Sequence, residues 1–347
     1  MDKLIHVEDT PVTHNDGDNI EVDNSASIYT TRFATAADAE AICRLFEKVF
    51  KEKMTLAHWR WKYERELSRA IVVYRDEQLV AHYGGVGTRI LLEGKTSTAM
   101  QVTDLMVDPQ ARNAVRSNSP FYLSAKKFLE GFVGFDKPFL LGYGFPSDRA
   151  MDLSEKLGLF TPVGNMWEAR WSVKQDQTLN VKNIITLDKN NFQKYEAKIN
   201  SLWHKFSHHF SNHFICDKNA DYFKWRFLFH PSKKYSIHIV PGRLTKVPKA
   251  IFVLRHDQNK KSMLMDILCS SLDLENIIKL ALVMSAHKGS SEVIAWHSDS
   301  FKKVFSVLSS VQEPLAIKIP ANIGSVGLDP ELQKNKWWFM PGDTDYL

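Results

Sequence analysis

The sequence predicts an α/β protein built from two tandem domains, and three observations lead to this fold class. The chain has 347 residues, a length that suggests two domains, each large enough to bury its own core. Strand-like and helix-like segments follow in the order β-α-α-β-β-β-α-β-α-β over residues 28–176. A similar order then restarts in residues 177–347, which indicates an internal duplication.

In the first half, the elements follow from alternation, helix caps and turn residues. Residues 27–35 alternate as a strand, and Thr35 with Asp38 forms a capping-box pattern at the start of a helix. A second helix begins at Thr55. Three strands joined by short turns follow, and Pro109 ends the last of them.

The rest of this half alternates helices and strands. A helix is predicted from Ser119–Pro120 to about Phe132, because Ser is a favourable N-cap and Pro is favourable at the first helical position. Residues 139–145 are fully apolar, so we expect a central, buried strand. A helix over 146–160 and a strand over 165–173 complete the half.

The second half repeats the pattern after a polar stretch. Helices are predicted over 190–206, 221–227, 274–288 and 301–311, and strands over 234–240, 249–255, 262–268, 292–298 and 315–320. Three pairs of short motifs recur: Trp61-Lys62-Tyr63 with Trp225-Arg226-Phe227, Asp104-Leu105-Met106 with Asp266-Ile267-Leu268, and Ser147-Asp148 with Ser298-Asp299. The halves are therefore predicted to share one fold.

The composition excludes several classes of protein. With 44% hydrophobic and 24% charged residues, the chain is neither wholly disordered nor fibrous. Its three widely spaced cysteines fit buried thiols in a reducing compartment better than a disulfide or zinc framework. We find no signal-peptide pattern and no apolar run of membrane-spanning length. We expect a cytoplasmic protein without membrane insertion.

The charge is uneven along the chain. Residues 1–27 hold one Lys and seven Asp or Glu, and this polar segment is predicted to be a disordered acidic tail. The remaining 44 Lys and Arg against 33 Asp and Glu give +11. Such an excess favours an anionic partner such as a phosphorylated cofactor, RNA or a membrane surface, or serves general solubility.

The strand VTDLMVDP, the polar loop after it and the next helix start form the most informative stretch. A helix start leaves several N–H groups without intrahelical partners and carries partial positive charge. Arg112 and Arg116 precede this start, and Ser117, Asn118 and Ser119 add small polar groups. This pattern predicts a pyrophosphate-binding loop; the alternative is an ordinary helix cap with two solvated arginines.

These features together resemble the GCN5-related N-acetyltransferase (GNAT) superfamily. The resemblance rests on the order of elements, the V-D-P strand ending, the loop into a helix and the pattern A-x-x-L-x-E-K-L-G-L-F at residues 150–160. It covers nearly the whole chain as a tandem pair, with the first half the better copy. It implies that each domain has a mixed, mostly antiparallel twisted sheet flanked by helices, and that the second domain is degenerate.

The resemblance also implies binding residues for acetyl-CoA, used as a cosubstrate. The backbone of the fourth strand would hold the pantetheine arm, and the loop with the helix start would hold the pyrophosphate. The residues at these positions are Leu105, Met106, Val107, Arg112, Arg116, Ser117, Asn118, Ser119, Pro120 and Phe121, with Ser147 at the next helix start. The segment departs from the superfamily by lacking glycines. Ser147 and Ser154 replace the usual Asn and Tyr, and that Tyr often protonates the leaving thiolate.

Amine acylation by a thioester also requires a base that takes a proton from the amine. Asp104 on the fourth strand is one candidate, because strict alternation turns it away from Leu105 and Val107. His82 and Tyr83 on the third strand are the others. For Asp104 and His82, the alternative is a structural hydrogen-bonding role.

Two further clusters carry weaker signals. His204, His208, His209 and His213 include pairs spaced four residues apart, but no Cys, Asp or Glu lies among them, so we expect no metal site. The segment Trp337–Phe339 is predicted to anchor a last strand through its large rings.

Three functions stay open at this stage. The first is an acyl-CoA-dependent N-acyltransferase that acts on a small-molecule or peptide amine by direct attack. The second is a non-catalytic acyl-CoA-binding or interaction protein. The third is a transfer-RNA-dependent aminoacyltransferase, for which salt-dependent RNA binding would be the signature, although the sequence favours no nucleic-acid partner.

Overall fold

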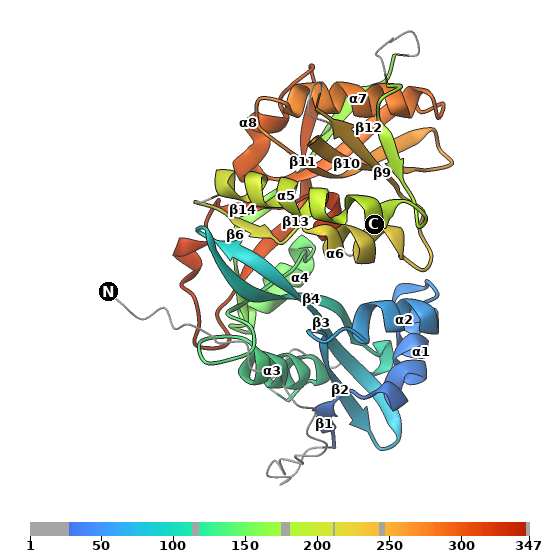
Figure 1. The fold of residues 1–347 in the computed structure, drawn as a ribbon. Coiled ribbons are helices and arrows are strands. Elements are labelled where there is room, and N and C mark those ends of the chain that lie inside the picture. The colour runs from blue at the N-terminus through green and yellow to red at the C-terminus, as the bar shows by residue number, and fades with distance from the viewer. Residues whose placement is uncertain (1–27, 113–117, 175–180, 211, 243–246, 345–347) are drawn as a thin grey trace.

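The structure is a computed structural model that describes residues 28–112, 118–174, 181–210, 212–242 and 247–344. The predicted disordered tail, residues 1–27, lies outside these residues. Two sheets with flanking helices make up the described chain (Figure 1). This arrangement confirms the predicted α/β fold class.

The first sheet is built mainly from the first half of the chain, in the order β1-β2-β3-β4-β5. Its strands are β1 (Thr30–Phe33), β2 (Arg69–Arg75), β3 (Gln78–Leu92), β4 (Lys95–Val107) and β5 (Leu141–Tyr143), and β8 (Phe214–Cys216) and β14 (Trp337–Trp338) extend it beside β3. Its helices are α1 (Ala39–Phe50), α2 (Leu56–Tyr63), α3 (Pro120–Phe132) and α4 (Asp148–Lys156), with short 3-10 turns η1 (Ala36–Asp38) and η2 (Pro109–Ala111).

The second sheet has the order β13-β6-β12-β11-β10-β9-β7. Its strands are β6 (Phe160–Ser172), β7 (Ile185–Leu187), β9 (Ser236–Pro241), β10 (Pro248–His256), β11 (Lys261–Cys269), β12 (Glu292–Ser298) and β13 (Val311–Asn322). Its helices are α5 (Glu196–Ser207), α6 (Ala220–Phe223), α7 (Leu274–Ala286) and α8 (Lys302–Phe305), with the π turn η5 (Lys224–Leu228) and the 3-10 turns η3 (Phe192–Tyr195), η4 (His208–Phe210), η6 (Asp299–Phe301), η7 (Pro330–Leu332) and η8 (Pro341–Asp343).

Local caps explain where the helices of the first half begin. The Thr55 hydroxyl accepts a hydrogen bond from the His58 N–H at the start of α2. Ser119 caps α3 in the same way through the Tyr122 N–H, with Pro120 as the first helical residue. The predicted helix start at Ser119–Pro120 and its end near Phe132 are confirmed.

The two sheets repeat one strand order, which supports the duplication. In the first, β4 pairs in parallel with β5, and in the second β11 pairs in parallel with β12, whereas the strands preceding them pair antiparallel. The tryptophans that recur in the sequence, Trp61 of α2 and Trp225 of η5, meet between the halves. Trp61 and Trp225 stack at 4.8 Å, and each indole N–H donates to the other's carbonyl.

Each half gives strands to the sheet of the other half: β6 joins the second sheet, and β8 and β14 join the first. Strand β6 comes from the first half but pairs antiparallel with β12 and β13 (Figure 1). Strand β13 in turn meets the start of α4 through a bridge between Ser147 and Ile317. Strands from each half form hydrogen bonds with strands of the other half. The domain boundary at 176–177 therefore remains a prediction from the sequence repeat.

Two sequence expectations need correction. The apolar run 139–145 is buried, but β5 ends the strand order of its sheet and is not central; the aromatic rings of Trp337 and Phe339 cover it. The helix predicted over 301–311 ends at Phe305, and β13 begins at Val311. The side chains of the predicted terminal anchor, Trp337–Phe339, are buried as expected.

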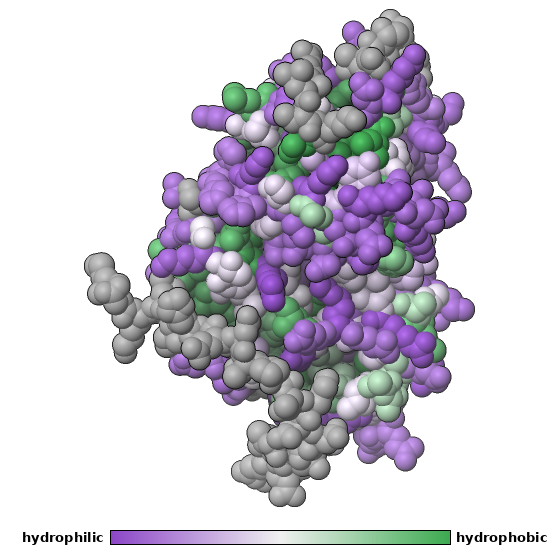
Figure 2. All heavy atoms as spheres, in the orientation of Figure 1, coloured by the Kyte–Doolittle hydropathy of each residue, from purple (hydrophilic) through white to green (hydrophobic). Residues whose placement is uncertain are grey.

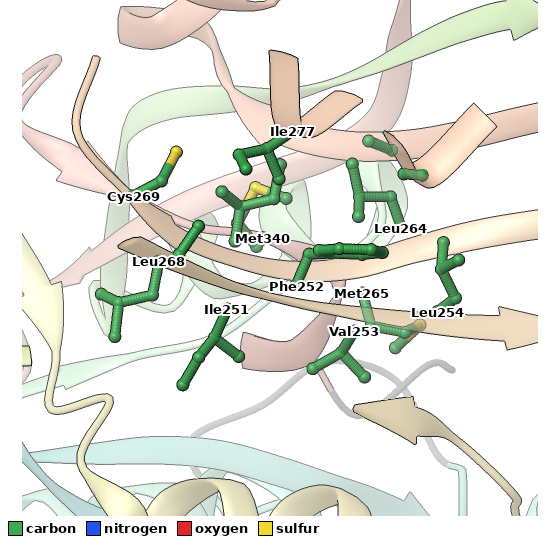
Figure 3. Close-up of a cluster of buried hydrophobic side chains, with 14 of the residues drawn as sticks. Ile251, Phe252, Val253, Leu254, Leu264, Met265, Leu268, Cys269, Ile277 and Met340 are labelled. Carbon is green, nitrogen blue, oxygen red and sulfur yellow. The ribbon is translucent and has the colours of Figure 1, made fainter. Parts of the chain in front are cut away.

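The hydrophobic core of the second half is continuous across β10, β11 and α7. Figure 3 shows side chains of these elements, including Phe252, Leu264 and Ile277, gathered around Met340 from the end of the chain. The first half is built on smaller clusters, one under α3 around Phe128 and one under α1 around Ile42. The second half therefore depends on the C-terminal segment around Met340 for the packing of its core.

The face shown in Figure 2 is mostly hydrophilic, and hydrophobic residues reach it only in small separate groups. Within the described part of the chain, no helix combines the length and the apolar character that crossing a membrane requires.

Candidate active site on the third and fourth strands

A bulge in β4 determines the geometry of the candidate site. The register between β3 and β4 shifts between His82 and Gly84, and Asp104 on the opposite strand has a left-handed backbone with φ of 51°. The side chains of Thr103 and Asp104, although consecutive, both reach Lys62. Asp104 thus lies away from Leu105 as predicted, but the bulge, not strict alternation, is the reason.

Asp104 lies in a buried polar cluster under α2. Lys62 Nζ donates to its carboxylate at 2.8 Å, and the Tyr63 hydroxyl donates at 2.6 Å. Burial acts to raise the pKa of Asp104, but the charge of Lys62 and the two hydrogen bonds outweigh it, and this pKa is lowered. A carboxylate held by these contacts is a weak base, and it fixes the positions of the Lys62 and Tyr63 side chains.

His82 has one nitrogen engaged and one without a partner. Its Nδ1 lies 2.8 Å from the backbone carbonyl of Asp104, which can only accept, so Nδ1 carries the hydrogen. Its Nε2 is buried and has no hydrogen-bond partner among the described residues. Burial lowers the pKa of His82, so the imidazole is neutral with a free lone pair on Nε2.

Tyr83, the third base candidate, lies on the opposite face of the sheet. Its ring packs against Phe128 and Phe121 in the cluster under α3, and burial raises the pKa of its hydroxyl. The structure therefore brings His82 and Asp104 together and separates Tyr83 from them.

The other feature of the site is an open backbone edge on β4. The parallel ladder with β5 ends at the pair Gln101 and Tyr143, whereas β4 continues to Val107. At Gly144 the two chain segments still lie close together, since a Cβ there would be 3.1 Å from the Val102 carbonyl. Beyond this point β4 has no pairing with β5 among the described residues. Leu105, Met106 and Val107 lie on this open stretch, with Leu105 packed towards α3 and Met106 towards α1.

The loop and helix start expected to hold pyrophosphate adjoin this edge. The Arg112 side chain is exposed and donates through Nε to the Val107 carbonyl at 3.1 Å. Asn118 is exposed, Ser119 caps α3, and the Pro120 and Phe121 side chains lie in its first turn. Arg116 and Ser117 lie outside the described residues.

Ser147 sits at the next helix start. Its hydroxyl accepts from the Ala150 N–H and caps α4, and its backbone bridges to Ile317 of β13. Ser154, at the position of the usual tyrosine acid, is buried in the same helix.

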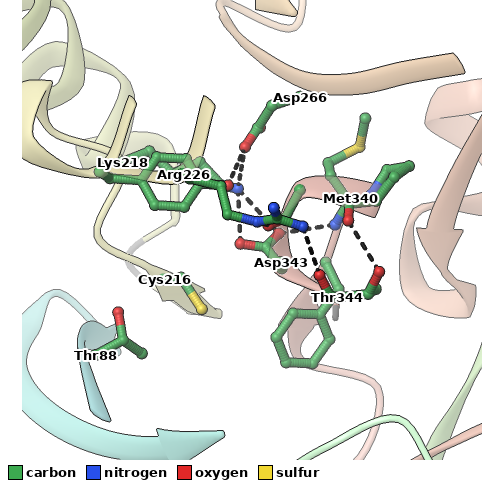
Figure 4. Close-up of polar contacts among 12 residues, drawn as sticks. Thr88, Cys216, Lys218, Arg226, Asp266, Met340, Asp343 and Thr344 are labelled. Carbon is green, nitrogen blue, oxygen red and sulfur yellow. Dashed lines mark hydrogen bonds and ion pairs between the residues drawn. The ribbon is translucent and has the colours of Figure 1, made fainter. Parts of the chain in front are cut away.

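The second half has a counterpart of the Asp104 cluster that is completely enclosed. Asp266 on β11 and Asp343 near the chain end both accept from Lys218, at 2.7 and 2.9 Å, and Tyr222 also donates to Asp266 (Figure 4). Burial raises the pKa of Asp266 to about 6 against the lowering effect of Lys218. The cluster fastens the C-terminal segment, since Asp343 also accepts from the Met340 N–H.

No group of three or more His, Cys, Asp or Glu side chains in the described part of the chain is arranged to hold a metal ion. His204 and His208 do pair, with ring nitrogens 3.1 Å apart.

One protein-family model matches part of the first half of the chain. Residues 30–118 match the acetyltransferase (GNAT) domain family. No curated protein matches the sequence.

Solved structures share the fold over most of the chain at low sequence identity. A probable N-acyltransferase of unknown function from Enterococcus faecalis has a TM-score of 0.65 at 10% identity, covering 88% of this chain and 75% of that one. A GCN5-related N-acetyltransferase from Anabaena variabilis has a TM-score of 0.59 at 10% identity, covering 86% and 73%. Saccharomyces cerevisiae N-myristoyltransferase with bound myristoyl-CoA has a TM-score of 0.56 at 11% identity, covering 93% and 87%.

These findings define the class of protein. Residues 30–118 match the GNAT domain family, and the described part of the chain shares its fold with solved structures of GNAT acyltransferases. Proteins of the GNAT acyltransferase class take their acyl group from acyl-CoA and transfer it to an amine.

Sequence reasoning missed two residues of the site. Lys62 and Tyr63 hold the Asp104 carboxylate, but only their recurrence in the Trp61-Lys62-Tyr63 motif marked them. The unpartnered Nε2 of His82 depends on the bulge, which has no local signature in the sequence.

Proposed function

We propose that the chain transfers an acetyl group from acetyl-CoA to a primary amine by direct attack, in the first half of the molecule. The thioester carbon forms a bond to the amine nitrogen, its bond to sulfur breaks, and the CoA thiolate leaves. The amine must lose a proton in the process, and the thiolate or solvent finally takes it up. No protein nucleophile is required, and Cys43 lies on α1 with burial raising its thiol pKa.

The CoA-binding residues in this proposal are those of the open β4 edge and the α3 start. Backbone groups of Leu105–Val107 would pair with the pantetheine amides as an added strand does. The α3 start with Asn118–Phe121 and the Arg112 guanidinium would face the pyrophosphate, with Arg116, Ser117 and Ser147 contributing. Support comes from the β4 backbone, which has no further β5 partner beyond Gln101 among the described residues.

The observation that carries the proposal is the state of His82. A neutral imidazole fixed with its hydrogen on Nδ1 is ready to accept a proton at Nε2. We assign His82 as the general base and Asp104 as the residue whose carbonyl positions it. The contacts of the Asp104 carboxylate, to which Lys62 and Tyr63 both donate, support this division of roles.

The test uses the full chain. Calorimetric titration with CoA and acetyl-CoA measures binding, and release of free thiol across a panel of amines measures transfer. Acetyl-CoA binding with amine-dependent thiol release is expected. Tight CoA binding without turnover would support a non-catalytic binding protein, and turnover only with long-chain acyl-CoA would contradict acetyl as the group. We place the reaction in the cytoplasm, where the reduced state of the three thiols is maintained.

A further inference from the structure

A small cavity lies where the two halves of the chain meet. Its volume is about 40 Å³, and side chains of both halves line it. The stacked pair Trp61 and Trp225 forms part of its wall. A space of this size holds a few water-sized groups, since one water needs roughly 10–15 Å³ by the same measure, so it fits one small functional group of a ligand.

The polar side chains of the cavity are mostly donors. Nε2 of Gln101 is buried and has no hydrogen-bond acceptor among the described residues. Next to the cavity, the Arg65 guanidinium lies 3.8 Å from the Trp225 ring centroid, and its buried Nη1 also has no acceptor in the described part of the chain. Buried donors of this kind are normally satisfied, so each one indicates a missing acceptor.

The charged side chains that line the cavity are all positive. Lys62, Arg226 and Lys233 line it, and the described residues that line it include no Asp or Glu. Lys62 is paired with Asp104, and Arg226 donates to the carbonyls of Gly342 and Thr344. Lys233 has no carboxylate within ion-pair distance among the described residues.

Burial and the positive charges around the cavity lower the pKa values of neighbouring titratable groups. Burial, together with Arg255 and Arg226, lowers the pKa of Lys233 to about 8, against the opposing effect of Glu52. Burial and nearby cations lower the pKa of His58 to about 4 and that of His230 to about 3. The site therefore contains cations and neutral donors at neutral pH.

The cavity lies on the same face of the first sheet as the candidate active site, and Lys62 connects the two. The cross-strand pair Val86 and Gln101 forms its floor, and the pair Gly84 and Thr103 lies between that floor and His82. Val86 is four residues from His82 along β3, roughly 13 Å at about 3.3 Å per residue. Lys62 contacts both places, since it lines the cavity and binds Thr103 and Asp104.

We propose that this cavity binds a carboxylate of the acceptor, so that the substrate is a small amine whose amino group reaches His82 while its carboxylate lies in the cavity. Gln101 and Lys233 are its specificity-determining residues. A planar carboxylate fits the volume and accepts from several donors at once, which matches a lining with a buried unsatisfied donor and no Asp or Glu among the described residues. The inference rests on the proposed function, which it extends to the acceptor.

The test compares ω-amino acids of increasing length, from glycine to 8-aminooctanoate, with their carboxamides, which keep the shape and remove the charge. In the wild-type chain with acetyl-CoA, the longer acids should be preferred over their amides by about tenfold to 100-fold in kcat/KM. Lys233→Gln and Gln101→Leu should each reduce that preference, mainly through KM. Lys234→Gln, the exposed neighbour, is the matched control and should keep it.

Equal rates for acids and amides in the wild-type chain, or equal losses for both in Lys233→Gln, would overturn the assignment. Thermal stabilisation by the same acids, but not the amides, tests the site without turnover. Stabilisation that is lost in Lys233→Gln upholds the site even where no acyl transfer is seen, so failure of the proposed function is distinguishable. If the acids stabilise the protein only after the substitution Asp345→Asn, the chain's own carboxylate competes for the cavity. That result would also overturn the assignment.

Discussion

At the residue scale, the division of work between His82 and Asp104 follows from their hydrogen bonds. The Asp104 carboxylate is occupied by Lys62 and Tyr63, and its carbonyl is what holds His82. A buried ion pair is costly to break on one side, because the remaining charge stays buried without a partner. Substitution of Asp104 should therefore act mainly by lowering the stability of the folded protein and not by removing the base of the reaction.

Asp104→Asn should lower the free energy of unfolding by about 3–5 kcal/mol, because it leaves the Lys62 ammonium buried without its counter-charge. Denaturant unfolding measures the loss. Glu40→Gln, which removes an exposed carboxylate 3.6 Å from Arg44, is the control and should change it by less than about 0.5 kcal/mol. The double variant Lys62→Met with Asp104→Leu should lose less than Asp104→Asn alone.

An Asp104→Asn protein that is as stable as wild type but inactive would contradict the positioning role of Asp104. It would indicate that the Asp104 carboxylate is the general base.

At the element scale, the end of β4 and the start of α3 form one binding surface. Both derive from sequence features that could be predicted: Pro109 ends the strand, and Ser119–Pro120 starts the helix. The bulge at Asp104 could not be predicted, because a left-handed backbone at an Asp depends on contacts from α2 and β3 that lie far away in sequence.

Arg112→Ala should weaken CoA binding by about 1–3 kcal/mol, the range for a charge-assisted hydrogen bond. Titration calorimetry should show a smaller loss for pantetheine fragments that lack the pyrophosphate. Arg60→Ala, an exposed arginine on α2, is the matched control and should bind as the wild-type chain does. Unchanged CoA affinity in Arg112→Ala would place the pyrophosphate elsewhere.

At the scale of the whole molecule, the two halves share strands. The sequence predicted a strand over 165–173, but nothing in the local sequence indicates which sheet that strand joins. In the structure, Ala169 and Trp171 are buried in the core of the second half. Element positions were therefore predictable from periodicity, whereas partners of β6 and β8 depend on long-range packing.

Expressed separately, residues 28–176 and 177–347 should each fail to unfold cooperatively, because β6 would lose its partners β12 and β13. Thermal melts followed by circular dichroism test this, and co-expression should restore the transition of the full chain. Two independently folding halves would show that the strand exchange is dispensable.

The interface between the halves should also make stability depend on pH. The pKa values of His58 and His230 are lowered to about 4 and about 3, so the folded state binds fewer protons than the unfolded state below about pH 6.5. Stability should be complete above that value and fall as the pH decreases towards 4. Melting temperatures against pH should show a shallower fall in His58→Gln than in the exposed control His204→Gln. Identical profiles would contradict the effect.

The central claim is that His82 takes the proton from the acceptor amine, and kcat/KM for acyl transfer by His82→Gln tests it most directly. The account predicts a decrease of about 10²–10⁴-fold with CoA affinity unchanged. Tyr83→Phe, on the other face of the sheet, should remain near the wild-type rate. The wild-type rate should itself fall with acidity only below the ordinary histidine range, because burial lowers the pKa of His82. A His82→Gln rate within about threefold of wild type, below the range of general-base effects, would contradict the claim, as would an acyl group trapped on a cysteine.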